Sequence, residues 1–172
     1  MIPFVTVPEN SKTLIQLHFM IKTALITGAT SGIGKATAKL LAQNNFKIVL
    51  CGRRKDRLEA LEKELSAFTA VHHLCFDVRD KKSVFESIAS LPEAFSDIDI
   101  LVNNAGNAHG LDSIQNGDMD DWDAMIDINV KGLLYVSKAI IPKMIAKESG
   151  HIINIGSIAG KEVYPNGNVY CN

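Results

Sequence analysis

The feature that most constrains the fold of this chain is a glycine-rich segment directly after a short apolar run. Residues 27–34 read TGATSGIG and follow Ala24, Leu25 and Ile26. An apolar run, closely spaced glycines and an alanine-rich helical pattern predict a strand, a tight turn and a helix N-terminus. Glycine permits sharp turns and close approach of a ligand, and the free N–H groups of a helix N-terminus attract anions. The segment is therefore predicted to bind the pyrophosphate of a dinucleotide, although its glycines depart from the G-x-G-x-x-G spacing.

Apolar runs alternate with amphipathic helical patterns along the rest of the chain. Strands are predicted at 23–27, 46–51, 70–76, 98–102 and 152–155, and helices at about 33–44, 58–68, 83–91 and 122–146. The continuous apolar centre of 46–51 is typical of a strand covered on both faces. Strands that alternate with helices predict an α/β fold, a doubly wound parallel sheet of the Rossmann type that ends after the fifth strand.

The helical spacing also predicts which side chains are buried. In the helix at 33–44 the buried face is expected to carry Ile33, Thr37, Leu40 and Leu41. In the long helix the expected apolar set is Trp122, Met125, Ile126, Val130, Leu133, Val136 and Ile140. Ser83 and Glu86 have the spacing of a capping box for the helix at 83–91.

Composition limits the partners and the compartment. A formal net charge of −1 gives no general attraction to nucleic acid or to an anionic membrane, and no apolar run has the roughly 20 residues that a membrane helix needs. Cys51, Cys75 and Cys171 lack C-x-x-C spacing, which argues against zinc and against a disulfide framework and favours a reducing, cytoplasmic location. Residues 1–19 match no targeting signal and are expected to be a loose extension before one domain at 20–172.

Polar residues follow the predicted strands, and ligands of open α/β sheets bind outside the carboxyl ends of the strands. Arg53 and Arg54 follow the second strand, where an NAD enzyme would place an acidic residue against the ribose 2′-hydroxyl. A guanidinium group binds a phosphate through two hydrogen bonds, so this pair favours NADP over NAD. The alternative is a solvated basic start of the following helix. Asp77 follows the third strand, residues 103–106 the fourth and Ser157 the fifth.

This constellation resembles the short-chain dehydrogenase/reductase family, whose Rossmann domain binds NAD or NADP. The resemblance covers about residue 20 to the C-terminus and rests on the turn at 27–34, Asp77, the NNAG at 103–106, Asn129, Ser157 and Tyr170. Within that family the chain is similar to the NADP-dependent 3-hydroxy acid (serine-type) dehydrogenases, which also reduce malonic semialdehyde. The matching segments of that group are GRR at 52–54, NNAG at 103–106, HIINIGS at 151–157 and GNVY at 167–170.

The resemblance implies a set of cofactor-binding residues. Asp77 would contact the adenine ring with Val78 beside it, whereas a lone Asp is more often a turn or cap residue. Asn103 would tie its loop to neighbouring elements. The full set is Gly28, Thr30, Ser31, Gly32, Ile33, Gly34, Arg53, Arg54, Asp77, Val78, Asn104, Ala105, Gly106 and Tyr170.

The resemblance also implies the catalytic residues. Hydride transfer from C4 of NADPH makes the carbonyl oxygen of a substrate basic, so one hydroxyl must protonate it and a second should hold it. Tyr170 would be the acid/base, Ser157 would hold the oxygen, and Asn129 would hold a water molecule in a proton relay. Each could instead be an ordinary loop or helix residue. The acidic residues at 118–123 are explained by the dipole of the following helix, and no metal is expected.

The family has a lysine four residues after the tyrosine, whereas this sequence ends at Asn172. The sequence is therefore interpreted as a C-terminally truncated copy that is inactive and poorly soluble by itself. The alternative is a non-catalytic nucleotide-binding remnant. The expected partner is a small-molecule substrate, and intact relatives are expected to form homotetramers.

Overall fold

The computed structural model describes residues 21–171; the expected extension at 1–19 and the terminal Asn172 lie outside the described residues. Five parallel strands form one sheet in the order β3-β2-β1-β4-β5. They are β1 (Thr23–Thr27), β2 (Lys47–Gly52), β3 (Val71–Cys75), β4 (Ile100–Asn103) and β5 (His151–Asn154). The predicted α/β fold with its parallel sheet is thus confirmed. Within residues 21–171, no helix combines the length and the apolar character needed to cross a membrane.

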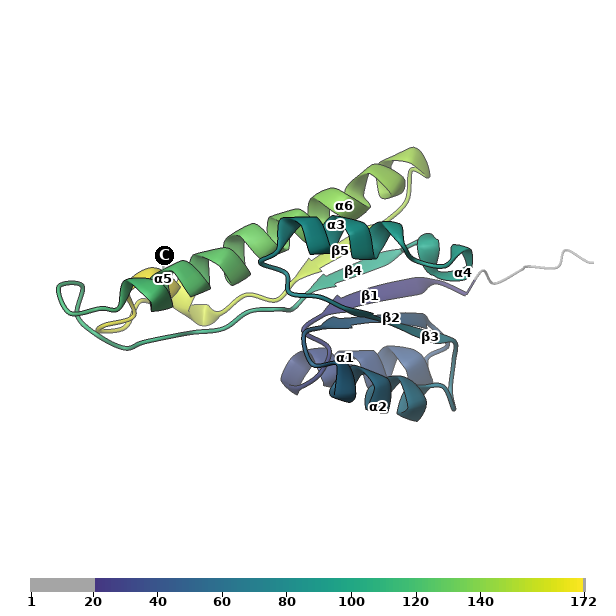
Figure 1. Cartoon of the computed structure of the whole chain (residues 1–172), viewed down its shortest axis with the longest axis horizontal. Helices are drawn as coiled ribbons and strands as arrows, with labels where there is room; N and C mark the ends of the chain where they lie inside the picture. Colours follow the sequence, from purple (N-terminus) through teal and green to yellow (C-terminus); the bar gives the residue numbers. More distant parts are fainter. Residues whose placement is uncertain (1–20, 172) are drawn as a thin grey trace, which may run out of the picture.

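Helices cover both faces of the sheet (Figure 1). On one face lie α1 (Gly32–Gln43) and α2 (Lys55–Leu65), and on the other lie α3 (Lys81–Ala89) and α6 (Leu133–Ala146). The helix that ends in α6 begins with α5 (Met119–Met125) and a π-helical segment, η1 (Ile126–Gly132). The remaining short elements are α4 (Glu93–Ser96), η2 (Ile158–Gly160) and η3 (Asn168–Cys171).

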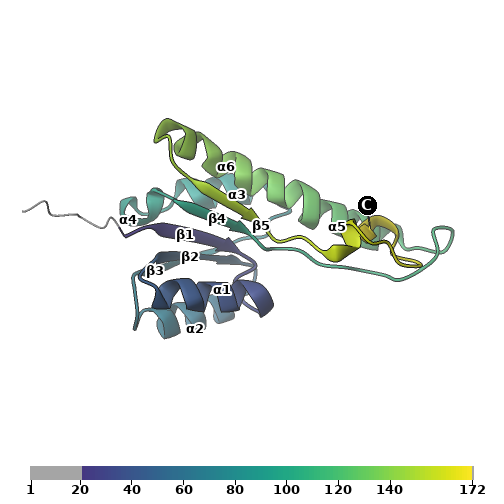
Figure 2. The same cartoon turned by 180° about the vertical axis from the view of Figure 1, so that it is seen from behind.

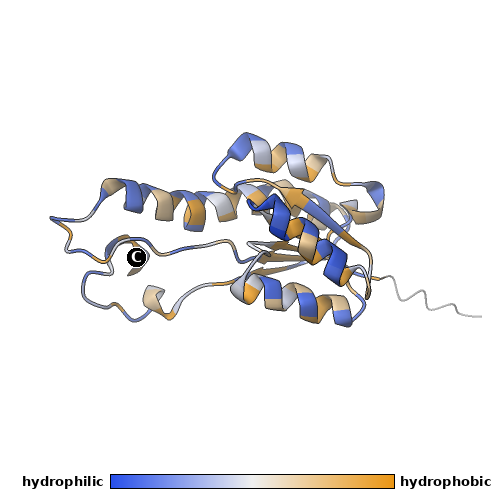
Figure 3. Cartoon of the chain, turned by 60° about the horizontal axis from the view of Figure 1, so that its bottom comes forward, coloured by the Kyte–Doolittle hydropathy of each residue, from blue (hydrophilic) through white to orange (hydrophobic). Residues whose placement is uncertain are grey.

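The central strand β1 is buried at every position and separates two hydrophobic clusters. Leu25 belongs to the cluster that contains Val84 of α3 and Val136 of α6. Ile26 belongs to the cluster that contains Ala38 of α1 and Leu58 of α2. Figure 3 shows the orange, hydrophobic strands between helices that carry both blue and orange residues. Successive residues of a strand point to opposite faces, so a strand covered on both sides must be apolar throughout.

The predicted buried face of the helix at 33–44 is partly wrong. Leu41 packs against the core as predicted. Ile33 and Leu40 are each 61% exposed, whereas Gly34, Ala38 and Ala42 are buried in α1. The helix contacts the glycine turn and the sheet through its smallest residues, because a larger side chain at Gly34 has no room. Close approach of the backbone therefore outweighs hydrophobicity in setting the orientation of α1.

The long predicted helix is present, but its apolar set is partly wrong. Met125, Val136 and Ile140 are buried as predicted, whereas Ile126 is 39% and Val130 52% exposed. Both exposed residues lie in the π-helical segment η1. A π-helix has more residues in each turn than an α-helix, so positions that would share a face at α-helical spacing separate there.

The predicted capping box is also wrong. The N-cap of α3 is Asp80, whose carboxylate accepts a hydrogen bond from the backbone N–H of Ser83 at 3.2 Å. Asp is among the preferred N-cap residues, and it precedes Ser83 at a position that starts the helix earlier.

The last strand differs in its surroundings from the others. β5 forms one edge of the sheet, and all four of its residues are exposed. Figures 1 and 2 show that α5 extends beyond the sheet and that the C-terminal segment lies next to it. The loops that follow the carboxyl ends of the strands lie on this side of the molecule.

Candidate functional site

A cleft of about 1300 Å³ lies at the carboxyl ends of the strands. Residues that follow each of the five strands line it, as the parallel arrangement of the sheet requires. The predicted site residues that line the cleft are Gly28, Thr30, Ser31, Gly32, Ile33, Arg53, Arg54, Asp77, Val78, Asn104, Ala105, Gly106, Asn129, Ser157 and Tyr170. Gly34 does not line it.

The glycine turn contains two positions with a positive backbone φ, +63° at Gly28 and +53° at Gly32. L-residues with side chains rarely adopt this conformation, which explains why both are glycine. A Cβ atom at Gly32 would meet nothing within 4 Å, so the backbone faces open space there. A Cβ at Gly34 would instead lie 2.5 Å from the carbonyl oxygen of Gly28. Gly32 therefore leaves room for a ligand, whereas Gly34 allows α1 to pack against the turn.

Thr27 and Asn104 hold the glycine turn against the loop after β4. The buried hydroxyl of Thr27 accepts hydrogen bonds from the backbone N–H groups of Asn104 and Ala105, both at 2.9 Å. The side-chain amide of Asn104 donates to the carbonyl oxygens of Thr27 at 2.9 Å and Gly28 at 3.2 Å. The two loops are thereby fixed relative to each other without a ligand.

Asn103 has the tying role that was expected of it. This residue is 4% exposed, and its amide donates to the hydroxyl of Ser137 in α6 and to the side-chain oxygen of Asn154 in β5, both at 2.9 Å. The side chain joins β4 to a helix and to the edge strand, and so fixes the end of β4 next to the cleft.

At the end of β2, Arg54 lies next to the glycine turn. Its guanidinium donates to the hydroxyls of Thr30 at 2.6 Å and Ser31 at 3.1 Å. Gly52, the last residue of β2, has no side chain. A Cβ atom at Gly52 would lie 3.1 Å from Cγ2 of Thr30. A positive charge and two hydroxyls thus meet where an acidic residue would select a ribose hydroxyl.

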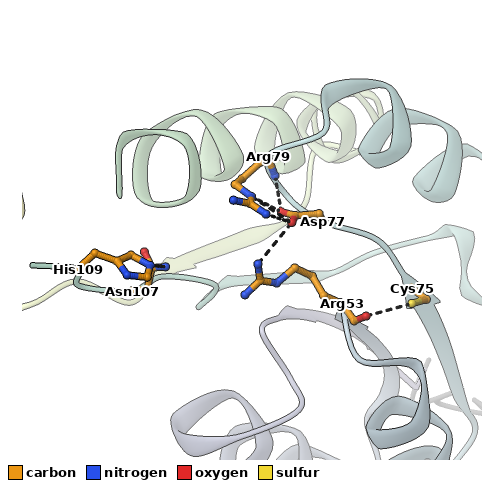
Figure 4. Close-up of polar contacts among 6 residues, drawn as sticks. All are labelled: Arg53, Cys75, Asp77, Arg79, Asn107 and His109. Atoms are coloured by element: carbon orange, nitrogen blue, oxygen red, sulfur yellow. Dashed lines mark hydrogen bonds and ion pairs between the residues drawn. The ribbon is translucent and has the colours of Figure 1, made fainter. Parts of the chain in front are cut away.

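Asp77 lies between two arginines, as Figure 4 shows. The Arg79 side chain donates to both carboxylate oxygens of Asp77 at 2.7 to 3.1 Å, and the backbone N–H of Arg79 adds a bond at 3.0 Å. Arg53 approaches the same carboxylate from the other side at 3.5 Å. Partial burial by itself would raise the pKa of Asp77, but the hydrogen bonds from Arg79 and the charge of Arg53 hold this pKa below its ordinary value. Asp77 is therefore ionised at neutral pH.

Asn129 lies in the π-helical segment and contacts the loop after β4. Its side-chain oxygen accepts from the backbone N–H of Asn107 at 2.9 Å, and its amide donates to the carbonyl oxygen of Asn107 at 2.8 Å. The Asn107 side chain in turn contacts Nε2 of His109 (Figure 4). π-Helical turns occur often at functional sites, where they re-aim a side chain. Here the turn aims Asn129 at the backbone of the cleft.

Ser157 and Tyr170 both line the cleft, from the segments after β5. The hydroxyl of Ser157 accepts a hydrogen bond from the N–H of Ala159 at 3.2 Å and caps η2. Tyr170 lies in η3 and is half-buried. The structure thus brings the two predicted catalytic hydroxyls to one cleft with the glycine turn and Asn129.

Two buried side-chain oxygens next to the cleft lack hydrogen-bond partners within the described part of the chain. The side-chain oxygens of Asn103 and Asn107 are buried and have no hydrogen-bond partner among residues 21–171. Both residues line the cleft, but the two oxygens themselves are buried within the protein. In the same part of the chain, no cluster of three or more His, Cys, Asp or Glu side chains could hold a metal ion.

Three residues of this site are not identified by the sequence patterns. They are Thr27, which bonds the loop after β4, Asn107, which bonds Asn129, and Arg79, which bonds Asp77. Arg79 could have been found, since an arginine two positions after an aspartate in a turn can bond it locally. The contacts of Thr27 and Asn107 join segments far apart in the sequence and carry no local signal.

Comparison with known proteins agrees with the fold. The family model for short chain dehydrogenase matches residues 22–172. The NADP-dependent 3-hydroxy acid dehydrogenase YdfG of Salmonella typhi is 47% identical over 146 residues. That match includes 85% of this chain and 58% of the relative, so the chain spans under two thirds of the length of such curated relatives.

Two solved structures show how far the fold itself is shared. The closed form of serine dehydrogenase complexed with NADP+ is 44% identical with a TM-score of 0.82, and the match includes 87% of this chain and 59% of that protein. An NAD+-bound xylitol dehydrogenase is 33% identical with a TM-score of 0.83, over 87% of this chain and 58% of that protein. Because structures bound to either cofactor match equally well, side chains rather than the backbone must decide the choice between NADP and NAD.

Proposed function

The chain belongs to the short chain dehydrogenase family, and we propose that its cleft binds NADP(H) for the interconversion of a carbonyl and a hydroxyl compound. The proposed substrate is a small 3-hydroxy acid or the corresponding semialdehyde. The names of the relatives at 44 to 47% identity support this substrate class.

The observation that carries the proposal is the charge of the cleft around the end of β2. The charged side chains that line the cleft are Arg53, Arg54, Arg79 and Asp77. Arg79 neutralises the one acid of this set through several hydrogen bonds, which leaves the other two guanidinium groups as a net positive region. A 2′-phosphate carries the charge and the oxygen atoms that such a region binds, whereas a ribose hydroxyl does not.

The other predicted residues fit a dinucleotide. Gly28, Thr30, Ser31, Gly32 and Ile33 would hold the pyrophosphate at the N-terminus of α1, where the open space at Gly32 admits it. Asp77 and Val78 would hold the adenine, and Ala105 and Gly106 would lie against the nicotinamide riboside. When bound, the reduced nicotinamide supplies a hydride to the carbonyl carbon of a substrate.

Two hydroxyl groups of the chain then protonate and hold the carbonyl oxygen of the substrate. The Tyr170 hydroxyl donates a proton to the oxygen that becomes negative, and the Ser157 hydroxyl donates a hydrogen bond that holds it. Asn129, held by its two bonds to Asn107, keeps a water molecule that returns a proton toward Tyr170. In the oxidative direction each proton moves the opposite way.

We propose further that the polypeptide of this sequence by itself binds cofactor but does not sustain reduction. Every residue of β5 is exposed, and Ile155 and Ser157 beyond it are exposed as well. A catalytic group must be held within a fraction of an ångström of its productive position. The strand that precedes Ser157 has little packing of its own to provide this.

Cofactor binding by the purified 172-residue chain tests the first part of the proposal. Calorimetric titration is expected to give at least tenfold tighter binding of NADP+ than of NAD+, because one bidentate charged contact is worth about that factor. Exchange of both Arg53 and Arg54 for Met should remove the preference and leave NAD+ binding within about twofold. Equal binding of both cofactors by the unaltered chain would contradict the assignment of NADP.

Oxidation of NADPH with malonic semialdehyde, followed at 340 nm, tests the second part. No steady rate above the blank is expected from the chain alone at cofactor saturation. A steady rate that Tyr170→Phe abolishes and Asn172→Ala retains would contradict the proposed inactivity and support the assignment of Tyr170.

A further inference from the structure

Building on the proposed binding of NADP, we propose that Arg79 is a specificity-determining positioning residue. It neutralises Asp77 and thereby leaves Arg53 free to bind the 2′-phosphate. Arg79 acts through Asp77, and its effect is confined to a cofactor that carries the 2′-phosphate.

The Asp77 carboxylate is bound much more closely by Arg79 than by Arg53. Arg79 makes its side-chain bonds to Asp77 at 3.1, 3.0 and 2.7 Å, whereas Arg53 reaches the same carboxylate through a single contact at 3.5 Å. Charged hydrogen bonds are strong near 2.7 to 2.9 Å and weak at the longest distances. The Asp77 carboxylate is thus committed to Arg79, and the Arg53 side chain, at 57% exposure, keeps its donors available.

Without Arg79, the Asp77 carboxylate would weaken NADP binding in two ways. Its carboxylate is the one acidic group among the described residues that line the cleft, and it faces the end of β2, where the 2′-phosphate would lie. Like charges at such separations repel. The same carboxylate would also attract the Arg53 guanidinium into a closer ion pair and so withdraw its donors from the cofactor. NAD, which has a hydroxyl at this position, meets neither effect.

The other acid near Arg79 does not draw the guanidinium away from Asp77. Asp127 in the π-helical segment also stabilises the charged form of Arg79, but its carboxylate bonds Lys131 at 2.7 Å. Lys131 therefore supplies a matched control: an exposed cation paired with an acid close to Arg79, with no atom lining the cleft.

The test measures the ratio of the NAD+ to the NADP+ dissociation constant by calorimetry for the unaltered chain, Arg79→Met, Arg79→Lys and Lys131→Met. Arg79→Met is expected to weaken NADP+ binding about tenfold and to change NAD+ binding less than about twofold. Arg79→Lys should recover most of the ratio because it keeps the charge, and Lys131→Met should leave it unchanged. Higher salt should reduce the loss, since exposed charges are screened over about 10 Å at 0.1 M.

The same measurement in an Asp77→Asn background separates the inferred route from other roles. With the carboxylate removed, Arg79→Met should no longer alter the ratio. A loss of similar size in that background would overturn the inference, because Arg79 would then contact the phosphate directly. An equal loss for both cofactors would also overturn it, since that is the signature of a merely structural role. If the unaltered chain does not prefer NADP+, the proposed function itself fails, which is a different result.

Discussion

The cleft has two halves that are built differently although their strands share one sheet. The nucleotide half consists of the ends of β1 to β4 and the loops after them; the catalytic half consists of β5 and the segment to residue 171. In the nucleotide half, β1 is buried at all positions, and the Thr27 hydroxyl and the Asn104 amide join two loops at 2.9 Å. In the catalytic half, β5 is exposed at all positions, and the Ser157 hydroxyl bonds within its own turn.

The two halves therefore differ in which contacts hold their functional side chains in place. The nucleotide half consists of β1 to β4 and of loops whose cleft-lining residues all lie within residues 21–108. In the catalytic half, Ser157 follows the exposed edge strand, so its order depends on what packs against that edge. Substitutions of similar chemistry in the two halves should therefore have very different effects on stability.

The largest loss of stability is expected for aliphatic side chains in a strand. Leu25→Ala in β1 should lower the free energy of unfolding by about 4 kcal/mol, because the side chain is fully buried and leaves a cavity. Ile152→Ala in β5 should lower it by only about 1.5 kcal/mol, because 36% of that residue is already exposed. Urea unfolding followed by circular dichroism measures both. Equal losses would mean that β5 is as well packed as β1 in solution.

A glycine pair gives the next largest loss. Gly34→Ala should cost about 3 kcal/mol, because the new Cβ would lie 2.5 Å from the carbonyl oxygen of Gly28 and force the turn apart. Gly156→Ala adds a Cβ with no atom within 4 Å and should change stability by less than about 0.5 kcal/mol. The same urea titration serves, and a Gly34→Ala variant as stable as the unaltered chain would show that the turn can move away.

Removal of one hydroxyl from each half is expected to give a smaller difference in stability. Thr27→Val keeps the shape of a side chain that is 2% exposed but leaves the N–H groups of Asn104 and Ala105 without their acceptor, which should cost about 2 kcal/mol. Ser157→Ala removes one partly buried cap bond at 3.2 Å and should cost about 0.5 kcal/mol. Amide hydrogen exchange adds a local test: Asn104 and Ala105 should exchange faster in Thr27→Val alone. Unchanged exchange there would mean that Thr27 does not hold the loop.

The sheet and the positions of its loops could be predicted from the sequence because they depend on local patterns. The continuous apolar centre of 46–51 predicts a strand buried on both faces, and the alternation of strands and helices predicts the parallel sheet. A parallel sheet then brings the ends of all strands together, so the predicted site residues could be grouped before their contacts were known.

What could not be predicted depends on contacts between distant segments. The orientation of α1 follows from the space between Gly34 and Gly28, which has no signature in hydrophobic spacing. The exposure of Ile126 and Val130 follows from a π-helical turn, and an apolar pattern at α-helical spacing cannot reveal one. The bonds of Asn129 to Asn107 likewise appear only once the two segments are packed together.

The smallest effect concerns the charge of the nucleotide half. Partial burial opposes ionisation of Asp77, but Arg79 and Arg53 outweigh it and lower the pKa of the carboxyl in the folded chain. Its contribution to stability is therefore fully present above the ordinary pKa, about 3.9, and is lost as the pH falls through the lower pKa of the folded state. Unfolding in urea between pH 7 and pH 3 should show a shallower loss for Asp77→Asn than for the unaltered chain, with the gap closing toward acid. A gap for Asp77→Asn that stays constant from pH 7 to pH 3 would mean that the variant acts through packing rather than through this charge.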